Sequence, residues 1–385
     1  MNDNTEVFSD SHNPMDTPKK KVRNSNLELY RIIVMILIVA HHYVVNSGLF
    51  GMIQNAPISP AGTAMLIFGG WGKTGIDCFL LISGYFLCTS SLSWRKLLKL
   101  YLQITFYAII IYIIFCFTGH EHFSIFRFVL KLNPIEKINN NYFVSCFLLF
   151  YLFIPFINIL LKALTKAQHK KLVILLLIVY TILPSHGMSI TFNYVSWFVA
   201  IYIMAAYIRW YGLWPKIRHS AWGWMTILLA IAGAISVFCM EYAYKAGLYG
   251  KFDPYFFIAD SNKLLSVGIA VSSFMYFKDL KLPYSRLINA VGAATFGVLL
   301  IHANSEAMRT WLWKETIDTT GHFGDSVMMT LGYAMVSVVL VFVLCAGIDW
   351  FRGRLIEPFY IKYAERCARY LKPRLQKILK RLKLT

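Results

Sequence analysis

Apolar segments of about 20 residues recur along this 385-residue chain, and they constrain its fold more than any other feature. Hydrophobic residues make up 57% of the chain and charged residues only 15%, and the mean hydropathy is +0.54. Because an unpaired backbone amide or carbonyl is costly in hydrocarbon, such segments cross a bilayer as helices. We therefore predict an all-α, polytopic integral membrane protein.

The apolar segments predict about ten transmembrane helices. We place them at residues 30–50, 64–88, 97–118, 142–161, 171–185, 192–211, 222–244, 256–277, 287–312 and 327–350. With the N-terminus inside, 29 of the 38 Lys and Arg residues fall in inner segments and seven in outer segments. This asymmetry follows the positive-inside rule and predicts that both termini are cytoplasmic.

The two ends of the chain differ from the membrane domain, which we place at residues 27–351. Residues 1–26 are polar and are expected to form a disordered cytoplasmic leader. Residues 352–385 alternate apolar and basic positions at helical spacing, which predicts an amphipathic tail on anionic lipid headgroups. The net charge of +19 lies between spans, so we expect no nucleic-acid binding. The seven cysteines show no metal-site spacing, and we expect no metal.

The first span carries ionisable residues inside an apolar run. Arg31 opens the run, and His41 and His42 interrupt it. Arg31 and His42 are eleven residues apart, which puts them on one helix face about 16 Å apart. Ionisable groups at membrane depth are costly and mark candidate functional sites. The alternative is an interfacial anchor at Arg31 and an interhelical hydrogen bond at His42; His41 points about 100° away, and we expect it to pack.

The second span contains five glycines together with Lys73 and Asp77. Glycines permit close helix packing or a broken helix. Lys73 lies four residues before Asp77, within helical reach, so a buried structural ion pair and direct catalysis are both open. We expect Ser83 and Gly84, near the end of this span, to serve helix packing.

Two further groups of polar residues stand out. His302, followed by Asn304, Ser305 and Glu306, interrupts the ninth span in its outer half, where packing and function are both open. Lys96 and Lys99 lie one turn apart at the cytoplasmic edge of the third span, near the expected position of Arg31. They fit either positive-inside topology or a phosphate-binding mouth.

Together these segments resemble the integral-membrane acyltransferase family 3, which includes polysaccharide O-acetyltransferases. The resemblance covers about residues 26–350. Its motifs are, in chain order, Arg31 and His42; Gly75, Asp77, Phe79, Ser83 and Gly84; and the FGVLLIH stretch ending at His302. The family's Arg-x-x-Arg pair at the third span is represented by two lysines, and Leu102 stands where a proline is frequent, so the chain departs from the family pattern there.

The resemblance implies acyl transfer, usually of acetyl, from cytoplasmic acyl-CoA to a hydroxyl of a cell-surface or lipid-linked glycan. It places the protein in the plasma membrane, in a bacterium the cytoplasmic membrane. The candidate catalytic residues are His42, Arg31, Asp77 and His302, and the candidate donor-binding residues are Arg31, Lys96 and Lys99. A neutral imidazole can act as a general base, and the alternative of a transient acyl-histidine stays open.

A transporter of a glycan precursor or small anion is the alternative function. The same intramembrane residues would then form a proton or substrate relay, and the lack of a clear internal repeat in the sequence weighs against it. A purely structural scaffold is the third alternative, and intramembrane His and Asp argue against it. The sequence leaves open the acceptor sugar, the acyl chain and whether the chain forms a homo-oligomer.

Overall fold

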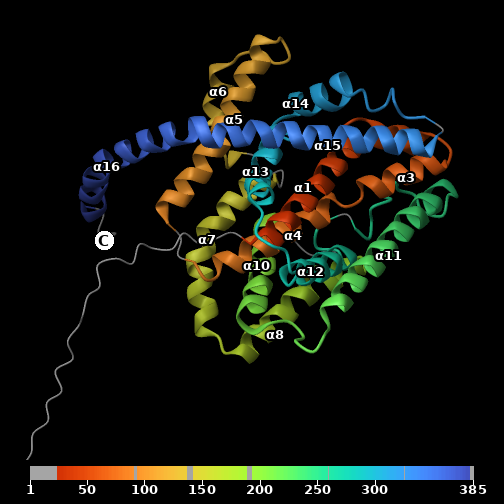
Figure 1. Ribbon diagram of the computed structural model, residues 1–385, viewed down its shortest axis with the longest axis horizontal. Helices are drawn as coiled ribbons and strands as arrows, with labels where there is room; N and C mark the ends of the chain where they lie inside the picture. Colours follow the sequence, from red (N-terminus) through yellow and green to blue (C-terminus); the bar gives the residue numbers. More distant parts are fainter. Residues whose placement is uncertain are drawn as a thin grey trace, which may run out of the picture.

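The computed structural model describes residues 24–90, 93–136, 142–188, 193–258, 260–324 and 326–381, and it is all-helical there (Figure 1). The helices are α1 (Ser25–Val45), α2 (Leu49–Asn55), α3 (Pro60–Gly69), α4 (Gly72–Leu87), α5 (Trp94–Phe117), α6 (Ile125–Lys131), α7 (Phe143–Ala163), α8 (Lys166–Leu177), α9 (Leu183–Ser185), α10 (Tyr194–Tyr211), α11 (His219–Lys245), α12 (Leu264–Lys278), α13 (Arg286–His302), α14 (Glu306–Thr310), α15 (Val327–Phe351) and α16 (Glu357–Arg381). Short π-helical segments follow α8, α14 and α15.

The described helices make the chain a multi-pass membrane protein, as predicted. Seven are long and apolar enough to cross a membrane, and there are eight if the bent pair α13–α14 counts as one span. The other two predicted spans correspond to α10 and α12. At 15 residues, α12 is about 22 Å long and shorter than the bilayer core of about 30 Å. The count of ten spans and the cytoplasmic position of both termini therefore remain predictions.

Two predicted spans differ from the observed helices in a way that affects the site. The segment predicted as one span at 287–312 is bent by 99° between α13 and α14. The bend occurs because the Ser305 hydroxyl accepts a hydrogen bond from the Met308 amide and caps a new helix. The span predicted at 256–277 begins only at Leu264, after a series of turns.

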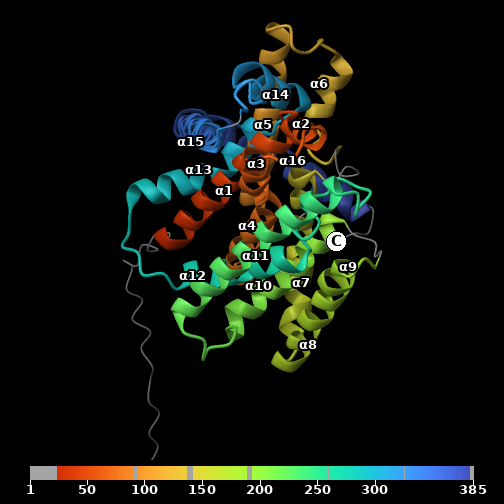
Figure 2. The ribbon, with the colours of Figure 1, turned by 90° about the vertical axis from the view of Figure 1, so that its right-hand side faces the viewer.

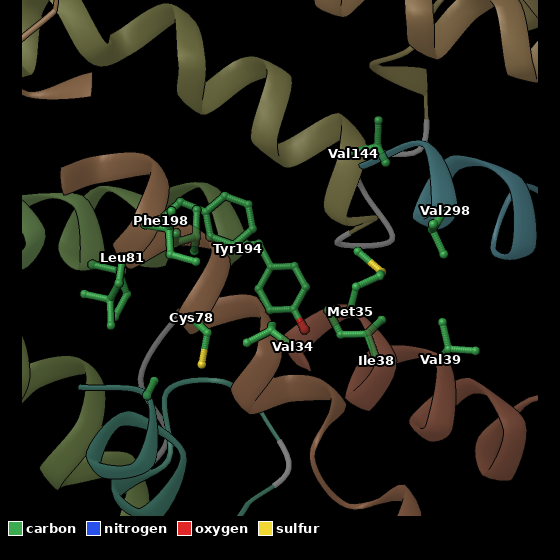
Figure 3. Packing of buried hydrophobic residues seen from close by; sticks show 14 of the residues in the cluster. Val34, Met35, Ile38, Val39, Cys78, Leu81, Val144, Tyr194, Phe198 and Val298 are labelled. Carbon is green, nitrogen blue, oxygen red and sulfur yellow. The ribbon is translucent and has the colours of Figure 1, made fainter. Parts of the chain in front are cut away.

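Helix α1 lies at the centre of the bundle and packs against α3, α4, α12, α13 and α15 (Figures 1 and 2). Its apolar face is buried in the main hydrophobic cluster, where Val34 and Met35 are each 1% exposed. Figure 3 shows these side chains beside Cys78 of α4, with Tyr194 of α10 pointing toward α1. Because α1 is enclosed on most sides, its polar residues face protein or cavities instead of lipid.

Helices α15 and α16 form a long arm along one side of the bundle, seen lengthwise in Figure 1 and with α15 end-on in Figure 2. The predicted tail is helical up to Arg381, and its contact with lipid headgroups remains a prediction. Of the predicted leader, residues 1–23 lie outside the described residues.

Gly84 serves helix packing, as predicted. A Cβ at this position would lie 2.8 Å from the Ala205 Cβ on α10 and 3.4 Å from the Tyr202 backbone. Neither neighbour is the end of a flexible side chain, so the two helices can approach this closely only with glycine here.

We expect Gly84→Ala to destabilise the protein by about 1–3 kcal/mol, because the added methyl group must push α4 away from α10. Gly347→Ala is the matched control, since a Cβ there meets nothing within 4 Å. The thermal unfolding midpoints of both variants in detergent test this. Equal midpoints would show that α4 and α10 are not packed as described.

Candidate active site

A cavity of about 590 Å³ lies inside the bundle, between α1, α4, α7 and α13. Arg31 and His42 both line it, as do Lys73 of α4 and Arg309 of α14. We call it the central cavity. The prediction that Arg31 and His42 share one helix face is therefore confirmed. The remaining lining is mostly apolar, with aromatic rings such as Phe79, which is typical of small-molecule sites.

His42 is held in position by a second histidine. Its Nδ1 lies 2.9 Å from Nε2 of His302, and Nδ1 of His302 lies 2.6 Å from the carbonyl oxygen of Val298. A carbonyl only accepts, so His302 donates from Nδ1 and its Nε2 must accept from His42. His302 is fully buried. The structure therefore brings together two of the predicted site residues.

This chain of hydrogen bonds fixes the tautomer of His42. Its Nδ1 carries the proton that is donated to His302, so Nε2 carries the free lone pair. Because His42 lines the central cavity, Nε2 is the ring nitrogen left for a molecule bound there. A neutral imidazole with an available lone pair is suited to removing a proton from a hydroxyl group.

Lys73 binds a residue of another helix instead of Asp77. Its ammonium group donates to the Tyr194 hydroxyl at 2.8 Å, and among the described residues it forms no ion pair with Asp77. The reason is that α10 packs directly on α4 and offers a phenol beside the lysine. The ion pair with Asp77, one of the two alternatives left open by the sequence, is therefore not formed, and Lys73 instead places a positive charge on the cavity wall.

Asp77 is fully buried but lies outside the set of described residues that line the central cavity. One of its carboxylate oxygens accepts a hydrogen bond from Trp197 Nε1 at 2.9 Å. The other oxygen is buried and has no hydrogen-bond partner in the described part of the chain. Asp77 thus joins α4 to α10.

The three predicted donor-binding residues do not gather at one point. Arg31 lines the central cavity and pairs with Glu28 at 3.0 Å. Lys96 and Lys99 are exposed and do not line it, although Leu100, which follows Lys99, does. A single mouth formed by all three cations is therefore not observed.

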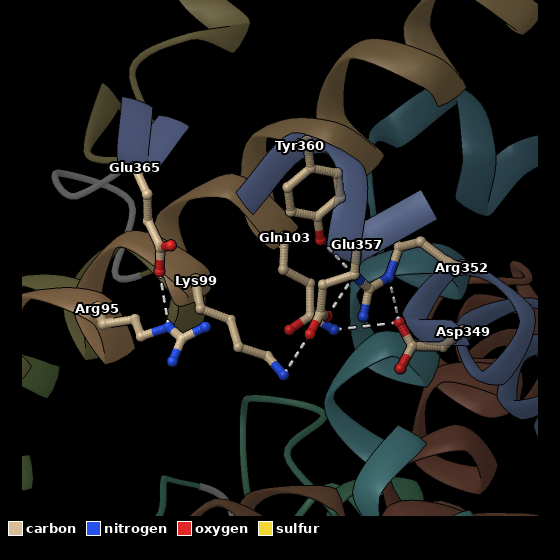
Figure 4. Close-up of polar contacts among 8 residues, drawn as sticks. All are labelled: Arg95, Lys99, Gln103, Asp349, Arg352, Glu357, Tyr360 and Glu365. Carbon is tan, nitrogen blue, oxygen red and sulfur yellow. Dashed lines mark hydrogen bonds and ion pairs between the residues drawn. The ribbon is translucent and has the colours of Figure 1, made fainter. Parts of the chain in front are cut away.

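Lys99 is directed toward helix α16, which supplies its ion-pair partner. Lys99 pairs with Glu357 of α16 at 2.5 Å, and Arg95 pairs with Glu365 at 2.8 Å (Figure 4). Glu357 also pairs with the buried Arg352 at 2.9 Å. These contacts fasten α16 to the start of α5.

Sequence reasoning missed this buried network at the end of α15. Arg352 pairs with Asp349 at 2.8 Å, and Asp349 also accepts a hydrogen bond from Gln103 of α5 (Figure 4). The same carboxylate accepts a second hydrogen bond from the Tyr107 hydroxyl of α5. The sequence signal for this network was the spacing of Asp349 and Arg352, which are three positions apart at the end of an apolar span and can pair on one helix face.

Sequence reasoning also did not predict that Arg309 lies at the central cavity. It was expected in an outer segment, but it lines the central cavity while pairing with Glu306 at 2.8 Å. The bend after His302 turns α14 back over the cavity and places Arg309 there. The Ser305 cap, a common helix-start signal, could have indicated this bend.

Comparison with protein families gave one match that covers most of the chain. Residues 24–350 match the acyltransferase 3 family model, described as an acyltransferase domain. Comparison with curated proteins and with solved structures gave no match.

We expect Trp197→Phe to destabilise the protein by about 1–3 kcal/mol, because it removes the hydrogen bond of the buried Asp77 carboxylate. The double variant Trp197→Phe/Asp77→Leu should recover part of this loss, since no buried carboxylate remains. Unfolding midpoints of the two single variants and the double variant form a mutant cycle. Additive effects would contradict the contact.

Proposed function

Since the chain belongs to the acyltransferase 3 family and is a membrane acyltransferase, we propose that it moves an acyl group, in the simplest case acetyl, from cytoplasmic acyl-CoA to a glycan hydroxyl. The acceptor is a cell-surface or lipid-linked saccharide, and the membrane is the plasma membrane. The observation that carries this proposal is the ring of His42, which lines a cavity with Arg31 and is oriented by His302.

The donor enters at the Arg31 end of the central cavity. Acyl-CoA is a polyanion, and Arg31 can hold one of its phosphates through paired N–H donors. With a cytoplasmic N-terminus, this end of α1 faces the side where acyl-CoA is available. The apolar and aromatic wall between Arg31 and His42 then accommodates the pantetheine arm and the acyl group.

Lys96 and Lys99 contribute at the rim of the cavity. Lys99 is adjacent in sequence to a lining residue, and its side chain is 51% exposed, whereas that of its partner Glu357 is 11% exposed. Glu357 keeps its ion pair with Arg352 when Lys99 leaves, so Lys99 can exchange Glu357 for a donor phosphate without leaving the carboxylate unpaired. Lys96, one turn earlier and exposed, can contact the same polyanion.

The reaction follows from the tautomer of His42. The acceptor oxygen attacks the thioester carbonyl carbon while Nε2 of His42 takes the hydroxyl proton. The carbonyl electron pair moves to its oxygen, and the positive charges of Lys73 and Arg309 favour this developing anion. The carbon–sulfur bond then breaks, and His42 returns the proton to sulfur, which gives the ester and free CoA thiol.

His302 acts as a positioning residue in this scheme. Its Nε2 accepts a hydrogen bond from Nδ1–H of His42, which keeps the lone pair of the neutral His42 ring on Nε2. When His42 becomes cationic, the same hydrogen bond strengthens because its donor is charged. Asp77 has a supporting role, since it fixes α4 through Trp197 and so sets the place of Lys73.

We expect His42→Ala to lower the rate of acyl transfer by about 10²–10⁴-fold, because the general base is removed. His186→Ala, at an exposed histidine, should retain full activity. The measurement is acylation of the surface glycan in a strain without other copies, together with CoA release by the purified protein. Undiminished transfer by His42→Ala would rule out the mechanism.

His302→Leu and His302→Gln should differ in kcat, because the glutamine oxygen can still accept a hydrogen bond from Nδ1 of His42 and leucine cannot. We expect kcat to fall about 10²-fold or more for the leucine variant, with a smaller loss for glutamine. The KM for acetyl-CoA should stay unchanged in both, since His302 does not contact the donor. Equal kcat values in the two variants would contradict the positioning role.

A further inference from the structure

A second cavity of about 280 Å³ adjoins the central cavity. It is lined by His41, Val45, Phe50, Gly70, Lys73 and Tyr255, and we call it the outer cavity. His41 and Lys73 line both cavities, so they form the wall between them. His41 was predicted to pack between helices, and in the structure it also lines both cavities.

The outer cavity lies at the end of α1 opposite to Arg31. Val45 is the last residue of α1, and Phe50 belongs to the following helix α2. With the predicted cytoplasmic N-terminus, this cavity is on the outer side of His42. A molecule that enters here approaches His42 without crossing the path of a donor that enters beside Arg31.

The chemistry of its wall suits a sugar ring. Phe50 and Tyr255 provide aromatic surface, with ring centroids 5.7 Å apart. Nδ1 of His41 donates to the Gly69 carbonyl at 2.6 Å, which leaves Nε2 as an acceptor. The Lys73 ammonium has three protons, of which one goes to Tyr194. An aromatic wall with a few oriented polar groups matches a ring that has both C–H faces and hydroxyls.

We propose that the outer cavity is the acceptor site and binds one hydroxyl-bearing sugar ring of the glycan. This inference rests on the proposed acyl transfer and adds the place from which the attacking hydroxyl comes. The bound ring presents its hydroxyl past Lys73 and His41 to Nε2 of His42, where its oxygen forms the ester bond and its proton passes to the imidazole.

A third cavity also adjoins the central cavity, through Tyr142 and Val144, but it is a poorer candidate. Its volume is about 60 Å³, which corresponds to roughly two water molecules at about 30 Å³ each. A sugar ring does not fit there without movement of the surrounding helices. Size therefore favours the outer cavity.

The test separates acceptor binding from donor binding. Val45→Trp fills the outer cavity, and Phe50→Leu, a milder change, removes one of its two aromatic rings and leaves Tyr255. We expect the acyl content of the surface glycan, measured by mass spectrometry in a complemented deletion strain, to fall at least about tenfold in both variants. The dissociation constant of acetyl-CoA for each purified, full-length variant should stay within about twofold of wild type.

Met52→Trp is the matched control, because Met52 lies on the same helix as Phe50 and is exposed outside the cavity. It should leave both readouts unchanged. Normal glycan acylation by Val45→Trp and Phe50→Leu would overturn the acceptor site while His42→Ala remained inactive. Weakened acetyl-CoA binding in both would also overturn it, by assigning the cavity to the donor. If wild type neither binds acetyl-CoA nor acylates glycan, the proposed function itself fails.

Discussion

The hydrogen bond between His42 on α1 and His302 on α13 is the interaction on which the site depends. Both histidines belong to helices in candidate membrane spans, where an unpaired polar group costs several kcal/mol. The chain of hydrogen bonds ends on the Val298 carbonyl, so both Nδ1 protons are used. What remains is one lone pair, on Nε2 of His42, at the wall of the central cavity. The need to pair polar groups inside the helix bundle therefore also orients the lone pair of His42 toward the central cavity.

The surrounding helices serve this pair by bringing charge to the central cavity. The bend after His302 turns Arg309 over the cavity, and the close packing of α4 places Lys73 on its wall. At the other end, Glu28 holds Arg31. Cationic groups therefore lie at both ends of a mostly apolar space, which suits the proposed transfer of an acyl group from a polyanionic donor through an anionic intermediate.

The sequence predicted the membrane fold and the shared face of Arg31 and His42, because both follow from periodicity within one helix. It did not predict contacts between helices. An ion pair of Lys73 with Asp77, four residues away, was one alternative, but the hydrogen bond that forms goes to Tyr194 on α10 and depends on helix packing. Arg309 was missed because the Ser305 cap was not recognised as the start of a new helix.

The central claim is that Nε2 of His42 faces the reacting carbon of a donor bound from the Arg31 end. A cryo-EM structure of the full-length protein with a non-hydrolysable acetyl-CoA analogue tests this most directly. The account predicts a phosphate of the analogue on Arg31 and its carbonyl group beside His42, with His42 still bonded to His302. An analogue bound elsewhere with the central cavity empty, or a His42 ring turned away from the carbonyl, would contradict it.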